Sequence, residues 1–437
     1  MDARLESRSP GDDAFPATTA WPSVLTLVLA AGALLPDAVL RDALTHAELP
    51  PGALTLSRPW AYTALAPFCE TLDALTLLSV RQHAALIAAV VALVALWRLI
   101  RRWRRGRWDP WRDVAATAEG MLLLVVAYAA IIVPRPIAGL HVRDPDLVAV
   151  DFHSHTNASR DVRARFTPEH NRAWHRAGGW HAAYVTDHLR VDGASRAMAA
   201  NPARAGDDTV LLPGVELRAG GMVFLVLGLT AEDLAAIEAR RTSGGRAGER
   251  HEHAVIITIP VDLAQLRTRT RTRAGPIVGL EVSDAGLKGF DQMQREHEAL
   301  MAAARKANLA PVAGSNTHGW SQTPPAWSLL RIPGWRALAP GALGARIETE
   351  LRERRFTAVR TVERYAADAG ATPLGLAATL PAVAWHMAAT LTLAERLACL
   401  AWIWGAALAI RVLRPLRTPA GDDPGPRARA CVRAPAE

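Results

Sequence analysis

Apolar segments near the two ends of the chain constrain its fold more than any other feature. Three lie in the first 140 residues and a longer one follows residue 370: Trp21–Pro36, His83–Trp97, Gly120–Val133 and Pro373–Ile410. A helix needs about 20 apolar residues to cross a bilayer, so each of the first three would have to recruit flanking residues. Lipid offers the backbone no hydrogen-bond partners, and a segment that crosses it alone therefore has to be helical.

These segments predict a membrane protein with a region of another kind between them. We expect an N-terminal membrane region over residues 1–140 with about three transmembrane helices, and a C-terminal membrane region over residues 369–417 with one or two. Hydrophobic residues make up 50% of the chain, a high share for a soluble protein. The alternative is a set of buried core helices. The tail over residues 418–437, rich in proline, glycine and arginine, has the composition of a disordered segment.

Arginine supplies almost all of the positive charge, since Lys288 and Lys306 are the only lysines in a chain of net charge +8. Much of this arginine lies beside apolar segments, where it anchors membrane helices. We therefore expect a lipid bilayer, and not nucleic acid, as the partner of the basic residues. The three cysteines lie far apart in the sequence and predict neither a thiolate metal site nor a disulfide framework.

The arginines also predict how the chain crosses a cell membrane. The run "RRWRRGR" at residues 101–107 is the strongest cytoplasmic marker. It favours a multi-pass inner-membrane protein whose central region is extracytoplasmic. Arg411, Arg414 and Arg417 follow the last apolar segment and should be cytoplasmic too, yet two crossings after residue 369 would place them outside. Either that region crosses an odd number of times, or one N-terminal span is false.

Residues 141–368 have the rhythm of an α/β domain. Seven short runs of β-forming residues alternate with helical stretches, and they start near Leu147, His181, Thr209, Met222, Ala254, Pro276 and Leu309. After the first run, Thr167 is placed to cap a helix and Pro168 to occupy its first position. A long helix with one apolar face is expected over Phe290–Asn308. Such alternation predicts a parallel sheet, and seven strands suit a distorted seven-stranded (β/α) barrel.

Side chains that can bind metal follow four of these runs: His153 and His155, then His188, then Glu216, and finally Asn316 with His318. In α/β barrels reactive side chains gather where strands end, because those loops share one face. An HxH pair in extended chain aims both imidazoles to the same side. The pair alone would be weak evidence, but four strand ends that carry ligand-type residues predict a metal site.

These motifs resemble those of the PHP family, the polymerase and histidinol phosphatase domain. The stretch "DFHSHTNASRD" at residues 151–161 matches the first family motif, DxHxHTxxSxD. The later motifs follow in order as "TDH", "PGVE" and "SNTH". The resemblance implies a distorted seven-stranded (β/α) barrel, a cluster of two or three metal ions, and hydrolysis of phosphoesters.

The resemblance also implies the roles of individual residues. One ion would be held by His153, His155, Glu216 and Asn316, and a second by Asp161, His188 and His318, with Glu216 shared. His153, His155, Glu216 and His318 would form the catalytic core. The two divalent ions, of zinc, manganese or iron, would activate the water that attacks the ester. Arg160 and Arg190, beside the ligands in sequence, would clamp the phosphate, unless they are ordinary surface arginines.

The sequence departs from the family pattern at three positions. Leu225 and Ile259 stand where family members place two histidines that hold a third ion, so we expect that ion to be missing. Asn316 stands in place of the usual aspartate and binds a cation less strongly. His251 and His253 precede the fifth strand, and we therefore expect them at the opposite end of the barrel.

Two functions of different classes follow. The first is a membrane-anchored, metal-dependent phosphoesterase acting on a phosphorylated small molecule or another phosphoester. The second is a metal- or phosphate-binding or sensory module whose altered site has lost turnover. A hydrolase of non-phosphate bonds is a third alternative. The sequence specifies neither the substrate nor the oligomeric state.

Overall fold

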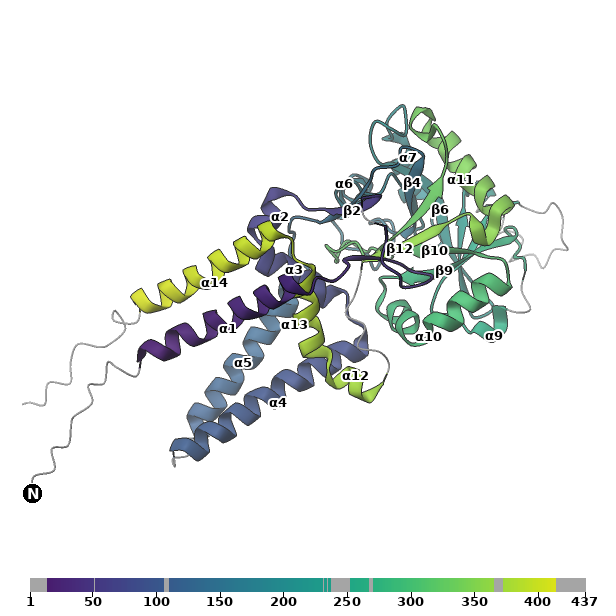
Figure 1. Cartoon of the computed structure of the whole chain (residues 1–437). Helices are drawn as coiled ribbons and strands as arrows, with labels where there is room; N and C mark the ends of the chain where they lie inside the picture. Colours follow the sequence, from purple (N-terminus) through teal and green to yellow (C-terminus); the bar gives the residue numbers. More distant parts are fainter. Residues whose placement is uncertain are drawn as a thin grey trace, which may run out of the picture.

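The protein consists of a curled β-sheet domain covered by helices, and a bundle of long helices that extends from one side of it (Figure 1). The computed structural model describes residues 14–50, 52–105, 110–230, 232–233, 235–236, 252–266, 270–364 and 372–413. The segment over residues 418–437, which the composition predicts to be disordered, lies outside the described residues.

Ten strands form one sheet in the order β1-β12-β11-β4-β5-β6-β7-β8-β9-β10. Their bounds are β1 Leu40–Asp42, β4 Leu147–Ser154, β5 Ala182–Val185, β6 Val210–Ala219, β7 Met222–Leu227, β8 Val255–Ile257, β9 Ile277–Asp284, β10 Ala310–Gly314, β11 Ala326–Arg331 and β12 Arg360–Arg364. A separate pair joins β2 (Leu54–Ser57) to β3 (Gly139–Val142). The large sheet curls until β10 approaches β4, where Ser154 and Thr317 form an isolated parallel bridge.

The seven predicted β-runs all form strands, β4 to β10, but the sheet is not the predicted parallel one. β7 is antiparallel to both β6 and β8. Antiparallel pairs also add β11, β12 and β1 beyond β4. The protein therefore has a mixed α/β fold with a curled half-barrel of ten strands, and the seven-stranded (β/α) barrel is not confirmed. The reason is local, since only Gly220 and Gly221 separate β6 from β7, and parallel pairing needs a crossover of a dozen residues or so.

The turn between β6 and β7 also changes the place of Glu216. Gly220 and Gly221 both have positive φ, 58° and 80°, which a two-residue hairpin turn favours and glycine adopts without strain. β6 consequently runs past Glu216 to Ala219 and does not end at the glutamate. Glu216 pairs across the ladder with Leu225, so the leucine lies directly beside the carboxylate.

Helices cover both faces of the sheet: α6 Pro168–Gly178, α7 Asp192–Ala199, α9 Leu263–Leu266, α10 Leu287–Lys306 and α11 Pro340–Arg354. Two of them confirm predictions. Thr167 caps α6 by accepting a hydrogen bond from the backbone N–H of His170, and Pro168 is its first residue. The long helix expected to begin near Phe290 is α10.

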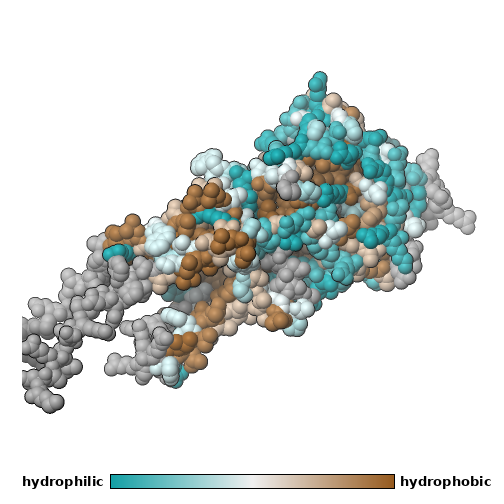
Figure 2. All heavy atoms as spheres, viewed as in Figure 1, coloured by the Kyte–Doolittle hydropathy of each residue, from teal (hydrophilic) through white to brown (hydrophobic). Residues whose placement is uncertain are grey.

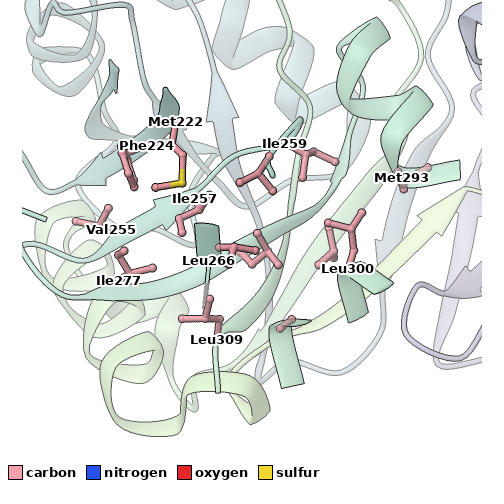
Figure 3. Close-up of a cluster of buried hydrophobic side chains, with 14 of the residues drawn as sticks. Met222, Phe224, Val255, Ile257, Ile259, Leu266, Ile277, Met293, Leu300 and Leu309 are labelled. Atoms are coloured by element: carbon pink, nitrogen blue, oxygen red, sulfur yellow. The ribbon is translucent and has the colours of Figure 1, made fainter. Parts of the chain in front are cut away.

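Two apolar clusters hold the helices on the sheet. In one, Leu343 and Ile347 of α11 pack with Val150, Leu212 and other strand residues. In the other, Met293 and Leu300 of α10 pack with Ile257 and Ile259, as Figure 3 shows. Burial of a leucine or isoleucine side chain contributes roughly 1.5–3 kcal/mol, so these clusters fix how α10 and α11 lie on the strands.

The bundle contains four long helices and several short ones: α1 Ala14–Leu34, α2 Trp60–Ala64, α3 Ala66–Thr76, α4 Val80–Arg105, α5 Pro110–Ala130, α12 Pro373–Ala377, α13 Thr379–Thr390 and α14 Leu393–Leu413. Two stretches, Val80–Ile100 and Leu393–Leu413, are long and apolar enough to cross a membrane. Only 6% and 17% of them is buried, so their apolar side chains face outward, where Figure 2 shows brown surface along the bundle. Core helices of a soluble protein would show the opposite.

The course of the bundle helices bears on the number of crossings after residue 369. Two crossings there would place the arginines at the end of α4 and those at the end of α14 on opposite sides of a membrane. α12 and α13 have only 5 and 12 residues, so after residue 372 only α14 runs the length of the bundle. The end of α4 and the end of α14 both lie remote from the sheet domain (Figure 1). Arg101–Arg105 in α4 and Arg411 in α14 are therefore at the same end of the bundle.

A buried carboxylate connects the bundle to the sheet domain. Asp73 of α3 is 1% exposed. It accepts hydrogen bonds from Tyr62 (2.8 Å), Arg135 (2.6 Å), Thr323 (2.8 Å) and Arg364 (2.5 Å). Arg364 is the last residue of β12, and Thr323 lies in the loop that follows β10. One side chain thus binds elements from both parts of the molecule.

Further ion pairs extend this connection to α14. Arg364 and Arg58 both lie 3.4 Å from carboxylate oxygens of Glu70, and Arg58 lies 2.6 Å from Glu395. With Arg135 and Asp73, three arginines balance three carboxylates. The balance matters because buried charges are tolerated only when they are paired and hydrogen-bonded.

We predict that Asp73→Ala strongly destabilises the protein, because it leaves Arg135 and Arg364 buried without their partner. Breaking a buried pair costs about 3–5 kcal/mol, which corresponds to a melting temperature lower by roughly 10 °C. Thermal unfolding in detergent, followed by circular dichroism, measures the effect. Asp208→Ala, which removes an exposed pair with Arg176, is the control and should change the melting temperature little. Equal melting temperatures for Asp73→Ala and wild type would contradict this account.

Candidate metal centre

The end of β4 is held in place by Asp151. Its Oδ1 accepts hydrogen bonds from the backbone N–H groups of His153 (3.1 Å) and Ser315 (2.9 Å). Its Oδ2 lies 2.7 Å from Nε2 of His175, which is fully buried on α6. Asp151 therefore fastens β4 to the segment after β10 and to α6, and the first aspartate of the motif positions the histidines that follow it.

His153, His155 and Glu216 come together at this end of the sheet. Nε2 of His153 lies 3.3 Å, and Nε2 of His155 3.5 Å, from Oε2 of Glu216. Nδ1 of His188 lies 3.1 Å from the same oxygen. Three imidazole nitrogens thus converge on one carboxylate oxygen, and all of these side chains except that of His188 are buried.

Asp161, His188 and His318 form a second group beside the first. Oδ2 of Asp161 lies 3.1 Å from Nε2 of His188 and 3.3 Å from Nε2 of His318. Nδ1 of His318 donates to the backbone carbonyl of Asn316 (2.8 Å), so Nε2 is the nitrogen that faces Asp161. The ring of His155 lies 4.6 Å from that of His188 and 4.4 Å from that of His318, so the two groups are contiguous.

The loop that carries Asp161 is fixed by a second buried aspartate. Asp187 accepts hydrogen bonds from the backbone N–H of Thr156 (2.7 Å), from its hydroxyl (2.7 Å) and from the hydroxyl of Ser159 (2.8 Å). The Ser159 oxygen in turn accepts from the backbone N–H of His188 (3.0 Å). The threonine, the serine and the aspartate of the "TDH" sequence therefore orient the loop that holds the candidate ligands.

Burial and mutual charge set the protonation of the group around Glu216. Burial opposes the charge on Glu216, but hydrogen bonds from His153 and His188 hold its pKa far below its usual range. Burial also opposes charge on His153, yet Glu281 and Glu216 raise its pKa well above the usual value. For His155, burial and the neighbouring His153 and His318 lower the pKa well below the usual value. His155 is consequently a neutral imidazole, the form that binds a metal ion.

His155 is also the observation that best tests whether the site suits a metal. It is 0% exposed, and among the described residues neither of its ring nitrogens finds a hydrogen-bond partner. An unsatisfied buried polar group costs roughly 1–3 kcal/mol, and a functional site can account for it. Imidazole and carboxylate are ordinary ligands of divalent transition metals. The residues therefore fit divalent ions, and three groups of three satisfy the spacing of a metal site: His155, His188 and His318; His153, His155 and Glu216; and His153, Glu281 and Asp284.

The third of these groups was missed by the sequence analysis. Oε1 of Glu281 lies 3.1 Å from Nδ1 of His153, and Asp284 lies at the end of the same strand. Both carboxylates are almost wholly buried, and burial raises the pKa of each, with Glu281 adding to the effect on Asp284. The signal was a glutamate in the apolar run "IVGLEV", because a carboxylate in a buried strand is costly without a partner.

The arrangement around His153 gives Glu281 a positioning role. With Nδ1 donating to Glu281, Nε2 of His153 turns toward Glu216 and the neighbouring imidazoles. A single nitrogen of His153 cannot bind a metal ion beside Glu216 and another beside Glu281 at the same time. Carboxylates that hold the second nitrogen of a metal-binding histidine are common, and they raise its basicity.

Other predicted residues lie near the centre without joining the two groups. The amide of Asn316 donates to Asp284 (3.3 Å), and Asn316 has a left-handed backbone with φ of 44°. Arg190 is exposed and lies 3.4 Å from Asp192, and Arg160 is exposed beside Asp161.

At the two positions where family members place histidines, 225 and 259, this chain has buried apolar side chains. Leu225 is fully buried opposite Glu216, and Ile259 packs in the cluster of Figure 3. His253 lies 3.5 Å from Asp233, ahead of β8 and remote from the two groups in the ladder. His251 lies outside the described residues.

Comparisons with known proteins give matches among solved structures and none among families or curated proteins. Among solved structures, PsfC from Pseudomonas syringae aligns with 54% of this chain and 96% of its own at 16% identity, with a TM-score of 0.33. A two-domain protein from Bacteroides vulgatus that contains a predicted PHP-like metal-dependent phosphoesterase aligns with 51% of this chain and 65% of its own (16% identity, TM-score 0.30). An amidohydrolase from Chromobacterium violaceum, with bound sulfate and no metal, aligns with 45% and 96% (19% identity, TM-score 0.29).

We predict that Glu281→Ala weakens metal binding without removing a binding site. Loss of a residue that orients a metal-binding histidine typically costs 10–100-fold in affinity, so the dissociation constant should rise by roughly that factor. Competition with a chelator measures the affinity, and element analysis counts the ions. Glu350→Ala, which changes a buried glutamate of α11, is the matched control and should leave the affinity unchanged. If Glu281→Ala instead lowered the number of ions per chain by one, Glu281 would be a ligand and the positioning role would be wrong.

Proposed function

We propose that this protein is a membrane-anchored, metal-dependent phosphoesterase that uses two divalent ions, of zinc, manganese or iron. The observation that carries the proposal is the convergence of His153, His155 and His188 on Glu216, with the fully buried ring of His155 left without a hydrogen bond. A structural core would satisfy such a ring or replace it with an apolar side chain.

The chain's own residues would divide the work. His153, His155 and Glu216 would hold one ion, and Asp161, His188 and His318 the second. Bound divalent ions supply a lowered pKa for water and charge that balances the phosphoryl oxygens. Glu216 lies between the groups because it touches both His153 and His188. Glu281 holds a proton on Nδ1 of His153, and Arg160 and Arg190, both exposed beside the centre, would bind phosphate oxygens.

A second function has a specific observation in its favour. Leu225 lies beside Glu216, and Asn316 donates its amide to Asp284. A site altered in this way could hold metal or phosphate without turnover, as a binding or sensory module. Metal binding alone would not separate the two functions, so the test has to include hydrolysis.

We predict that the purified full-length protein hydrolyses p-nitrophenyl phosphate or a phosphodiester analogue when manganese or zinc is added, and that His153→Ala abolishes this activity. Element analysis of the same reconstituted protein should approach two ions per chain. His318→Ala should remove about one ion, because it takes a ligand from the group that contains Asp161. His253→Ala is the control and should change neither the activity nor the ion count.

Three results would contradict this prediction in different ways. Bound metal with no hydrolysis on a broad panel of phosphoesters would favour the binding module. Near three ions per chain would show that the third group, with Glu281 and Asp284, is a separate binding site. Loss of metal in His253→Ala would show that this histidine reaches the centre.

We also propose that the chain lies in the inner membrane with the sheet domain outside the cytoplasm. Arginines mark cytoplasmic ends of helices, and those of α4 and α14 share the end of the bundle remote from the sheet domain. Reporter fusions should therefore give an extracytoplasmic signal at Gly139 and a cytoplasmic signal after Arg417. A cytoplasmic signal at Gly139 would end this proposal for the orientation.

A further inference from the structure

Exposed apolar side chains gather around the candidate metal centre. Of the described residues between 141 and 364, four large hydrophobic side chains are exposed: Leu189 (62%), Met198 (42%), Leu287 (60%) and Trp320 (45%). Leu189 follows His188 directly, Trp320 comes two residues after His318, and Leu287 comes three residues after Asp284. Three of the four thus border the centre, and we call Leu189, Leu287 and Trp320 the apolar rim.

Part of this apolar rim adjoins the helical bundle. The guanidinium of Arg163 lies over the ring of Trp320, at 5.6 Å, and it also donates to the backbone carbonyl of Ile132, just after α5 (3.4 Å). The backbone N–H of Arg163 donates to the carbonyl of His318 (3.0 Å). One arginine therefore connects the end of a bundle helix, the rim and a candidate metal ligand.

A second contact places the Leu287 side of the rim against the bundle. Leu287 begins α10, and Asp291 one turn later lies 3.7 Å from Arg81 at the start of α4. Leu77, which precedes α4, is buried in the same cluster as Phe290 and Met293 of α10. The starts of α10 and α4 thus lie together. The exposed apolar surface of α4 begins with Val80, which is 49% exposed.

Several arginines lie on the loops beside the rim. Arg160, Arg165 and Arg190 are exposed on the loops that follow β4 and β5, Asp161 and Asp192 beside them are also exposed, and Arg163 lies over the ring of Trp320. A ligand that reaches the metal centre from the bundle side therefore passes arginines and apolar side chains together. A soluble sugar phosphate or a nucleotide could stack on the Trp320 ring but would leave Leu287 exposed without an apolar partner.

We propose that the substrate is an amphiphilic phosphate ester that remains partly in the membrane, with its phosphate at the metal centre and its hydrocarbon chain against the apolar rim. This inference rests on the proposed function and deepens it by naming the substrate class. The rim shields the first part of the chain from water, and the exposed surface of the bundle helices continues into the lipid that holds the remainder. Leu189, next to His188, would also border the phosphate.

The test compares binding of two non-hydrolysable probes, hexadecylphosphonate and ethylphosphonate, by the metal-loaded full-length protein in detergent. Calorimetric titration should show the long-chain probe binding at least tenfold more tightly, since it buries apolar surface that the short probe lacks. Trp320→Ala and Leu287→Ala should each reduce that preference several-fold and leave binding of ethylphosphonate unchanged. Met198→Ala removes the one exposed side chain of the four that does not border the centre, and it should keep the full preference.

The outcomes separate this inference from the proposed function. Hydrolysis of p-nitrophenyl phosphate with equal affinity for both phosphonates would overturn the inference and leave the phosphoesterase intact. A chain-length preference that Met198→Ala reduces as much as Trp320→Ala does would reflect partition into detergent, and would also overturn it. A preference that depends on Trp320 in a protein without hydrolysis would support the rim as a binding site for lipid phosphate and overturn the phosphoesterase.

Discussion

The buried carboxylate of Asp73 is the contact on which the relation between the two parts of the molecule depends. Its four partners come from four separate segments: α2, the chain after α5, the loop after β10, and β12. A buried anion is stable only while its hydrogen bonds and its charge are satisfied, so these segments are held together as a set. Thr323, one of the partners, follows His318 by five residues. The helical bundle therefore takes part in positioning a candidate ligand of the metal centre.

The acidic residues around the centre divide into three roles by what surrounds them. Asp151 and Asp187 accept hydrogen bonds from backbone N–H groups and hydroxyls and hold the loops in place. Glu216 and Asp161 face the imidazoles of the two candidate ligand groups. Glu281 holds Nδ1 of His153, the ring nitrogen that does not face Glu216. Carboxylates of one chemical type thus serve different purposes, because their neighbours decide whether a proton, a backbone amide or a cation completes their surroundings.

The sequence predicted much of this arrangement, and its errors have local causes. The runs from Leu147 to Leu309 all form strands, and the family resemblance named His153, His155, His188 and His318, which lie together at one end of the sheet. The expected parallel sheet was wrong because Gly220 and Gly221 form a tight hairpin turn, which makes β7 antiparallel to β6. Glu281 was overlooked because its strand was interpreted only as an apolar run. The pairing of β1 with β12 joins residues more than 300 positions apart, and no local pattern indicates such a contact.

That pairing of β1 with β12 has a consequence for how the chain folds as it is made. Leu40–Asp42 is synthesised more than 300 residues before its partner, Arg360–Arg364, which is the last strand of the sheet. Closing so long a loop is entropically costly and slow. A still longer stretch of chain separates α1 from α14, which pack against each other. Packing of α14 against α1 would bring β1 and β12 into proximity, so β1 would complete the sheet edge only after α14 has been made.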